Sequence, residues 1–386
     1  MSTIGPLIPA DETFHHQITD TFATVGQADR SWTEKVCAMA CARDGSLQLG
    51  FGIGKYPNRN VIDAYAGVSR GVEQWNVRAS REIAGDHTTS VGPVTYEVVE
   101  PLRAIRFALA PNDIVPIAFD WTFTGIAPPA LEQREHHRSR DGARLDADIV
   151  RYHHTGTARG WVEIDGERIE PDDATWISTR DHSWGVRYQV GAPVEDVAPT
   201  PIPEGVAMLI LWCPVLCERP DGSRYALHWY YQRHTFADVY ERIEFQGGVE
   251  YPDGRREPIA ALVPDLAFRD DNRRFLGGTL RFLMPDGSER PVTCAPVSDT
   301  GFHLGAGLYH GFDGQWHGQW HGARHVEGEH LADCSVPEVA RRVHQHRDCV
   351  ITVDDPMGGG TGWGNLQSIV YGAHPTMDLT EQASFL

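Results

Sequence analysis

The chain has 386 residues and a formal charge of −19 at pH 7. A surface this acidic is repelled by phosphate backbones and by anionic lipid, which excludes nucleic acid and membrane surfaces as expected partners. The length is too great for one ordinary core and predicts two domains. The longest apolar run, residues 206–217, is about half a membrane span and contains Pro214, so no membrane insertion is expected.

The sequence predicts a cytoplasmic protein. Residues 1–6 show neither the basic nor the apolar region of a signal peptide. The seven cysteines are an odd number and include no Cys-x-x-Cys pair of the kind that binds metal. We therefore expect mostly reduced thiols.

The predicted secondary structure is antiparallel and rich in hairpins. After a Pro-containing N-terminal arm, alternating apolar residues from Val36 lead into a turn at Asp44-Gly45 and resume at Leu47. Asp-Gly between two such runs is a strong hairpin signal. The same dipeptide recurs at residues 141, 165, 221, 253, 286 and 313. Together with 39 Gly and 25 Pro, these turns predict an all-β protein.

The chain divides into two halves of related pattern. Cysteines at i and i+4 precede an Asp-Gly turn both in residues 37–45 and in residues 213–222. Between the halves, residues 191–205 contain four Pro and three acidic side chains, as a linker does. We expect an N-terminal domain over residues 1–190, a linker over 191–205 and a C-terminal domain over 206–386. Helix is scarce, but Ser335-Val336-Pro337-Glu338 predicts one helix of about three turns that reaches His344.

Residues 180–187, Arg-Asp-His-Ser-Trp-Gly-Val-Arg, are the most unusual segment of the chain. Their flanks have strand composition, yet Arg and Asp are seldom buried unpaired. Such a break in the local pattern is typical of a functional site. The alternative is a structural ion pair of Asp181 with Arg180 or Arg187. A regular strand places Asp181 and His182 on opposite faces, so both can act at one site only if residues 183–185 bend or bulge.

A second cluster combines imidazole and indole side chains at residues 316–322. On a strand, His317, His321 and His325 would share one face, and a metal with a nearby glutamate as a further ligand is one interpretation. Positions i and i+4 on a strand are about 13 Å apart, which is too far for one ion. We therefore expect no metal there. The preferred interpretation is that this segment lines a cavity.

Three further segments contain candidate residues for substrate binding. Asp120 is a single carboxylate in an aromatic strand pattern, so it is either turned to solvent or a buried acid with a raised pKa. His153 and His154 point to opposite faces of a predicted strand, so at most one of them reaches an interior. Residues 229–234 form an aromatic, partly polar wall. The sequence contains no nucleophile elbow, His-Glu-x-x-His motif or phosphate loop, so neither a nucleotide cofactor nor common hydrolase machinery is expected.

The signature Asp181-His182-x-Trp184-Gly185 resembles that of a two-domain lipocalin-like group. This group holds carotenoid 1,2-hydratase (hydroxyneurosporene synthase) and kievitone hydratase, and related cyclases and Diels–Alderases share its architecture. The hairpin over residues 160–166 and the segment over residues 364–369 are also similar to the pattern of the group. The resemblance implies two lipocalin-like (calycin-type) antiparallel β-barrels packed together with few short helices, an apolar cavity and chemistry without a bound cofactor.

These features predict a cofactor-independent enzyme that acts on a hydrophobic substrate of terpenoid, isoprenoid or phenolic type. The expected reaction is hydration of a C=C bond or its reverse, with isomerisation or cyclisation by the same acid as a related outcome. We expect Asp181 to donate the proton and His182 to orient water, while Trp184 and Tyr188 face a cationic intermediate. The candidate substrate-binding residues are Trp184, Tyr188, Arg187, Asp120, Trp121, His153, Trp229, Tyr231, Trp316, His317, Trp320 and His321.

Two other functions stay open at this point. Barrels of this kind often only hold a ligand, so the protein could be a lipid or terpenoid carrier in which Asp181 is structural. A His-rich metallohydrolase is the second alternative. The substrate and the direction of the reaction are open as well, and so is the oligomeric state, including a homodimer.

Overall fold

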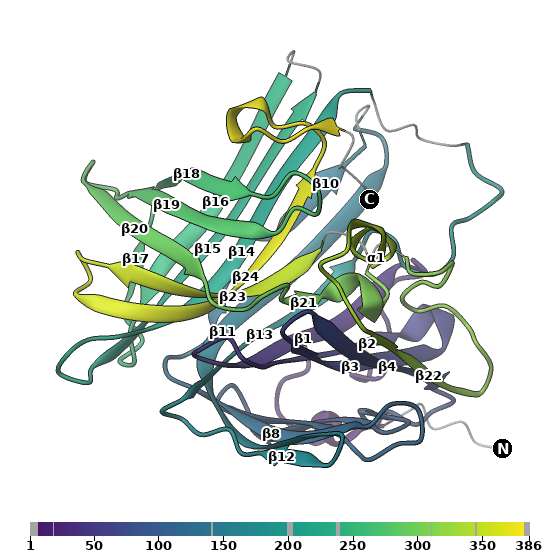
Figure 1. Ribbon diagram of the computed structural model, residues 1–386. Helices are drawn as coiled ribbons and strands as arrows, with labels where there is room; N and C mark the ends of the chain where they lie inside the picture. The colour runs from purple at the N-terminus through teal and green to yellow at the C-terminus, as the bar shows by residue number, and fades with distance from the viewer. Residues whose placement is uncertain are drawn as a thin grey trace, which may run out of the picture.

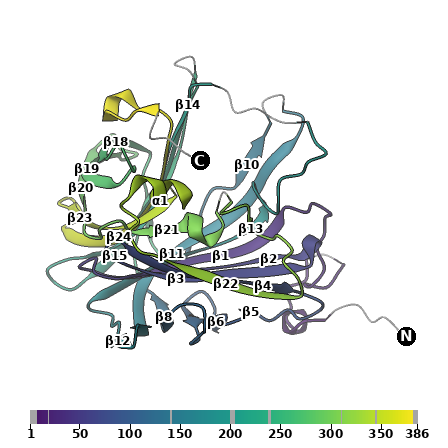
Figure 2. The ribbon, with the colours of Figure 1, turned by 45° about the vertical axis from the view of Figure 1, so that its right-hand side comes forward.

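The computed structural model describes residues 7–17, 19–139, 142–198, 204–236, 240–309, 311–343 and 346–381. Strands dominate the structure, and the predicted all-β class is confirmed (Figure 1). Two large antiparallel sheets each curl into a half-barrel, and the half-barrels pack against each other (Figures 1 and 2). No helix among the described residues is long and apolar enough to cross a membrane.

The first sheet has 14 strands within the described ranges, and its main order is β22-β4-β3-β2-β1-β13-β11-β8-β7-β6-β5. These strands are β1 (Trp32–Ala42), β2 (Gln48–Tyr56), β3 (Val61–Arg70), β4 (Glu73–Glu82), β5 (Ser90–Val91), β6 (Val94–Glu100), β7 (Ala104–Leu109), β8 (Ile117–Gly125), β11 (Leu145–Ile164), β13 (Trp176–Val186) and β22 (Arg324–Leu331). Three short strands also pair with β11: β9 (Ala130–Leu131), β10 (Glu135–Arg138) and β12 (Glu167–Ile169).

The second sheet has ten strands within the same ranges, in the main order β17-β16-β15-β14-β24-β23-β20-β19-β18. Its strands are β14 (Val206–Glu218), β15 (Arg224–Phe236), β16 (Tyr240–Glu250), β17 (Arg256–Pro258), β18 (Ala261–Phe268), β19 (Phe275–Leu283), β20 (Glu289–Pro296), β21 (Phe302–His303), β23 (Arg347–Asp355) and β24 (Gly360–Tyr371).

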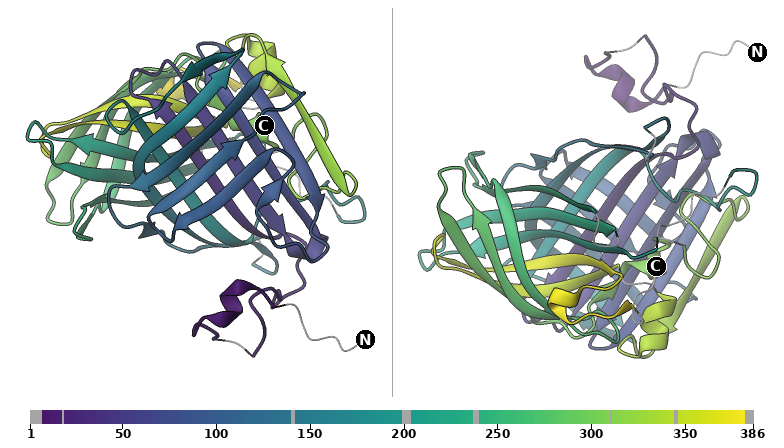
Figure 3. Two further views of the ribbon diagram at one scale, coloured as in Figure 1. Left: turned by 90° about the horizontal axis from the view of Figure 1, so that it is seen from below. Right: turned by 90° about the horizontal axis from the view of Figure 1, so that it is seen from above.

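Helical structure is sparse among the described residues. One α-helix, α1, spans Pro337–Arg342, and four 3-10 turns are η1 (Pro9–Glu12), η2 (Pro57–Arg59), η3 (Leu304–Gly307) and η4 (Pro375–Met377). The prediction of three turns capped by Ser335 is wrong for two reasons. The helix has only six residues, and Val336 is its N-cap because the Ser335 hydroxyl donates to Asp333 instead. Residue 344, the predicted end, lies outside the described residues. In both views of Figure 3, η1 lies apart from the two sheets.

The Asp-Gly turns join antiparallel strands as the sequence predicts. Asp44-Gly45 closes β1 against β2, and the turns at 165, 221, 253 and 286 likewise lie between paired strands. At 313 the turn joins an isolated bridge between Phe312 and Gln315. Residue 141 lies outside the described ranges. Local turn chemistry therefore accounts for most of the hairpins.

Strand β1 is buried on both faces, which determines how the half-barrels meet. Val36, Ala38 and Ala40 belong to the core enclosed by the first half-barrel. Cys41 points the other way and packs with Leu216 of the second sheet. A strand buried on two faces has no polar face, which explains its nearly unbroken apolar run. The outer face of the first sheet is thus the interface with the second sheet.

Strand β22 links the two predicted halves of the chain. It lies beyond residue 206, yet its residues pair with β4 from Arg324↔Arg81 to Leu331↔Gln74. The edge of the first sheet is therefore built from the C-terminal half, as Figure 1 shows. The division into residues 1–190 and 206–386 stays a prediction, and the described chain crosses that division at this strand.

Candidate functional site

A cavity of about 240 Å³ lies between the two sheets. Its charged lining residues are Lys35, Glu135, Arg151, Asp181 and Arg187. Its aromatic lining residues include Tyr56, Tyr188, Trp212, Tyr230 and Tyr309. Strands β1, β10, β11 and β13, with Arg187 directly after β13, supply the charges, whereas β14 and β15 supply Trp212 and Tyr230. The resemblance implies an apolar cavity, but this one combines aromatic walls with five charged side chains.

Asp181 reaches this cavity because β13 is a regular strand. Each of its residues from Trp176 to Val186 pairs in sequence with β1, without a register shift. Alternation therefore directs Asp181 and Ser183 toward the second sheet. The Asp181 carboxylate is only 14 % exposed. Its Oδ2 lies 3.7 Å from Nε of Arg151 and 3.3 Å from the Ser183 hydroxyl.

Burial raises the pKa of Asp181 above the usual value of an aspartic acid. The guanidiniums of Arg151 and Arg187 oppose this increase, while the nearby Glu132 adds to it. The net pKa is raised because the loss of solvent on burial outweighs the attraction of the two guanidiniums. A carboxyl group with these properties holds its proton more firmly than an exposed one does, as a general acid must.

Lys35 is the second ionisable group of note in the cavity. Its side chain is buried, and Nζ lies 2.9 Å from Nε2 of His317 and 3.8 Å from the centre of the Tyr309 ring. Burial, together with the charge of Arg187, lowers the pKa of Lys35 to about 7. The amine is therefore partly neutral near neutral pH.

His182 and Trp184 lie on the opposite face of β13 from Asp181. The His182 ring contacts Glu34 at 2.9 Å and the Tyr152 hydroxyl at 3.0 Å. Trp184 packs edge-on against both Tyr152 and His182. Because residues 183–185 do not bulge, the structure does not bring Asp181 and His182 to one site.

Gly185 of the signature is required by a close approach of two strands. Its φ is +136°, and a Cβ at this position would lie 2.0 Å from the carbonyl oxygen of Asp148 in β11. Any larger residue would push β11 away from β13. The signature glycine thus fixes the spacing of the strands that carry Arg151 and Asp181.

The other predicted substrate-binding residues divide between the cavity and distant places. Arg187, Tyr188 and His317 line the cavity with Asp181. Trp121 lies in the core of the first half-barrel, and Trp229 and Tyr231 lie in the core of the second.

The remaining members of that set also lie away from the cavity. Asp120 is bound by the guanidinium of Arg106, which donates to both carboxylate oxygens. Trp316 and His321 border a small separate pocket, and Trp320 is 55 % exposed. The predicted cavity lining over residues 316–321 thus contributes only His317 to the cavity between the sheets.

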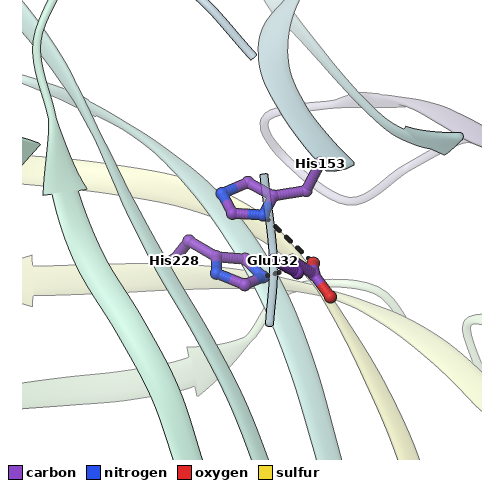
Figure 4. Close-up of side chains that lie close together, drawn as sticks. All are labelled: Glu132, His153 and His228. Carbon is purple, nitrogen blue, oxygen red and sulfur yellow. Dashed lines mark hydrogen bonds and ion pairs between the residues drawn. The ribbon is translucent and has the colours of Figure 1, made fainter. Parts of the chain in front are cut away.

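Glu132, His153 and His228 form a buried polar cluster (Figure 4). This cluster contacts Arg151 and Trp212, which line the cavity. Its centre is Glu132, which accepts hydrogen bonds from the Trp212 indole at 2.9 Å and from Arg151 at 3.2 Å. Glu132 Oε1 also lies 3.0 Å from Nδ1 of His153 and 3.4 Å from Nε2 of His228. Within the described residues, this trio is the one group of three ligand-type side chains close enough to share a metal ion.

The charges of this cluster are balanced without an added ion. Burial favours a neutral Glu132, but Arg151 and His153 offset it and hold its pKa below the usual range. His153 lies between Glu132 and Glu250, 2.8 Å from the latter. Burial disfavours its charged form, yet the two carboxylates raise the pKa of His153 to about 9. His153 is therefore an imidazolium bonded to two carboxylates.

Ring geometry also disfavours a shared ion. A bound metal lies close to the plane of each imidazole that ligates it. The rings of His153 and His228 are stacked, with centres 3.4 Å apart and planes within 16°. One ion cannot lie in the planes of two nearly parallel stacked rings. Both rings could therefore ligate the same metal only after one of them rotated. Burial holds the pKa of His228 well below its usual value, so this ring is neutral, and its nitrogens make no hydrogen bond among the described residues.

Sequence reasoning missed several residues that the structure brings to this site. Lys35 and Arg151 are charged residues within otherwise strand-like patterns, the same signal that singled out Asp181. Glu132 follows a two-residue strand and Tyr309 follows a 3-10 turn, and neither segment has a pattern that marks it. These two become visible only through the contacts of the folded chain.

The comparisons with known proteins concern fold and family. Solved structures that match include a protein assigned as AttH from Nitrosomonas europaea, 13% identical with a TM-score of 0.50, over 94% of this chain and 99% of that one. Kievitone hydratase from Nectria haematococca is 11% identical with a TM-score of 0.42, over 88% and 89% of the two chains. CghA with bound Sch210972 is 12% identical with a TM-score of 0.44, over 88% and 89%.

The match to the AttH structure shows a shared fold. Kievitone hydratase, a member of the group that the sequence resembles, is also among the matched structures. At these identities the likeness concerns the fold alone. No curated protein matches the chain in sequence. Residues 7–380 match the model of a family of unknown function, and the chain therefore belongs to this family, DUF8625.

Proposed function

We propose that the protein is an enzyme that transfers protons to a hydrophobic substrate in the cavity between the sheets, with Asp181 as the general acid. The proposed reaction adds water to a C=C bond or removes it. Isomerisation or cyclisation by the same acid is the related outcome. The observation that carries the proposal is a nearly buried carboxyl group that faces a cavity and has a raised pKa.

The charges of the cavity indicate which kind of C=C bond the site can act on. Arg151 and Arg187 carry permanent positive charges next to Asp181, and they disfavour a free carbocation. They favour a transition state in which negative charge grows on an oxygen atom. The site therefore suits a C=C bond conjugated to a carbonyl group better than an isolated alkene. Trp212 and Tyr230 offer apolar surface for the rest of the substrate.

In this mechanism, water adds to the far carbon of the conjugated bond while charge moves to the carbonyl oxygen near the guanidiniums. Asp181 gives its proton to the substrate and takes one from the added water. The net change is the addition of H and OH across the C=C bond. Because His182 lies on the other face of β13, where it contacts Glu34, it does not contact the substrate in this step.

The experiment starts from molecules that the purified protein retains, identified by mass spectrometry. These molecules, and a set of terpenoid and phenolic enones, are incubated with the protein in water enriched in heavy oxygen. We expect a product that has gained one labelled water, or has lost water, and a rate reduced on the order of 10²–10⁴ in Asp181→Asn.

Asp120→Asn is the matched control, because Asp120 is also paired with an arginine but lies outside the cavity. Its rate should equal that of the wild type. A single retained lipid that comes back chemically unchanged, with no turnover of any enone, would instead identify a carrier. Equal losses of rate in both variants would remove Asp181 from the mechanism.

A further inference from the structure

Lys35 is notable because lysine is so rare in this chain. The sequence contains two lysines, Lys35 and Lys55, against 32 arginines. An arginine remains charged at any accessible pH, whereas a buried lysine can become a neutral nucleophile. One of the two lysine amines in this chain lies in the cavity with the proposed acid.

The position of Lys35 on β1 brings its amine close to Asp181. Lys35 pairs with Ser183 and Cys37 pairs with Asp181, so Lys35 and Asp181 are diagonal neighbours on one face. The side chains that face the amine are those of Asp63, Cys37, Asp181, Arg187, Tyr309 and His317. Arg187 is the cation among them. A second cation next to a desolvated amine is a known way to keep a lysine neutral.

We propose that Lys35 binds the substrate covalently, as an imine formed with an aldehyde or ketone group conjugated to the reacting C=C bond. This inference relies on the proposed function for its site and specifies the substrate class of that site. The cavity supplies what such a step needs: an amine, an acid on the same face of the sheet, and aromatic walls for the apolar part of the carbonyl compound.

Lys35 and Asp181 together supply the nucleophile and the proton that imine formation requires. The nitrogen lone pair of neutral Lys35 attacks the carbonyl carbon, and a proton moves from nitrogen to oxygen to give a carbinolamine. Asp181 then gives its proton to the hydroxyl group, the C–O bond breaks and water leaves. The products are a protonated imine and the Asp181 carboxylate, one positive and one negative charge. The protonated imine withdraws electrons from the conjugated C=C bond, so that water adds to its far carbon. The Asp181 carboxylate takes a proton from this water and gives it to the near carbon, which restores the protonated imine. Hydrolysis of the imine then releases the product, neutral Lys35 and a proton that returns to Asp181.

A purely structural role makes a different prediction. If Lys35 served only as a counter-charge for Asp181 and Asp63, its amine would stay protonated and would not react with aldehydes near neutral pH. Lys55 provides the matched control. Its Nζ contacts His87 at 2.8 Å, and partial burial lowers its pKa as well, but it lies outside the cavity.

The test is reductive trapping of the full-length protein with cinnamaldehyde or citral and cyanoborohydride, followed by peptide mapping. We expect one stable adduct at Lys35 in the wild type and in Lys55→Arg, formed with a half-maximal rate near pH 7. Lys35→Arg, which keeps the charge, should lose the adduct. Asp181→Asn should form it at least ten-fold more slowly.

Mapping of the wild-type adduct decides the question even if Lys35→Arg does not fold. Labelling that falls mainly on Lys55 or on the N-terminal amine, or labelling of Lys35 that rises only above pH 10, overturns the inference. If enone turnover depends on Asp181 while Lys35 is never trapped, the proposed function stands and the imine is excluded.

Discussion

The guanidinium of Arg151 pairs with Asp181, with Nε 3.7 Å from Oδ2, although the sequence offers Arg180 and Arg187 as nearer partners. Arg151 also pairs with Glu132 at 3.2 Å and with Glu135 at 2.8 Å. One buried cation thus serves three carboxylates at the boundary between the cavity and the Glu132 cluster. Because Arg151 has two other carboxylate partners, the effect of Asp181 on stability can be measured separately from its proposed role as an acid.

The first prediction compares two variants of this pair. Asp181→Asn should change the free energy of unfolding by at most about 1–2 kcal/mol, because Arg151 keeps two other carboxylates. Arg151→Gln leaves buried carboxylates without a cation and should cost about 3–5 kcal/mol. Urea denaturation of both variants measures the difference. Equal losses of stability would mean that Asp181 is half of a structural ion pair.

The second prediction concerns alkaline stability. The pKa of His153 is raised to about 9, above its value near 6.5 in the unfolded chain, because Glu132 and Glu250 offset the cost of burial. Its charge therefore stabilises the fold fully below about pH 6.5, and this contribution, on the order of 3 kcal/mol, is lost as the pH rises through about 9.

Variants isolate this group from others that titrate in the same range. In His153→Gln, the fall of unfolding free energy between about pH 6.5 and 8.5 should be shallower than in the wild type. His154→Gln is the control, because burial lowers the pKa of His154 to about 3 and its contribution is lost on acidification instead. An unchanged alkaline slope in His153→Gln would show that His153 is neutral.

The third prediction tests the close approach at Gly185. Gly185→Ala combines the cost of a positive φ, about 1–2 kcal/mol, with an overlap against Asp148 that costs about 1–3 kcal/mol more. Gly166→Ala is the control, since Gly166 has a φ of +82° but no atom within 4 Å of the added Cβ. Melting temperatures should fall further for Gly185→Ala. Similar decreases would mean that β11 shifts without cost.

The fourth prediction is that the purified protein contains no stoichiometric Zn, Fe or Mn. His317 contacts Lys35, whereas His321 stacks on His325, so these three histidines do not form one site. Elemental analysis after dialysis checks the prediction. About one equivalent of metal that survives in His321→Ala but is lost in His228→Ala would contradict it and would assign the ion to Glu132, His153 and His228.

The fifth prediction concerns the segment between the sheets. Limited proteolysis should cut first within residues 191–205 and leave two fragments of similar mass. They should stay associated without denaturant, because β22 from the C-terminal fragment pairs with β4 from the N-terminal one. Size-exclusion chromatography of the nicked protein measures this. Early cuts scattered through either half would count against the predicted division.

The sequence by itself determined the β class and most of the hairpins, and it singled out the segment around Asp181 as a candidate site. These features are local: an Asp-Gly turn or an apolar alternation acts over a few residues and needs no distant partner. The alternation of a regular strand predicted that Asp181 and His182 would separate unless residues 183–185 bulged, and the structure shows no bulge there.

Only the tertiary structure decided which face of that strand lines the cavity and what surrounds it. Lys35, Arg151 and Tyr309 come from three distant segments. Strand β13 pairs with β1 on one side and with β11 on the other, and Tyr309 reaches the cavity from the segment after η3. The curling of each sheet placed Trp121 and Trp229 in the two cores. The pairing of β11 with β13 set Arg151 beside Asp181. Patterns of period two specify that a side chain faces one side of a sheet, but the curvature and stacking of the sheets determine whether that side is core, cavity or solvent.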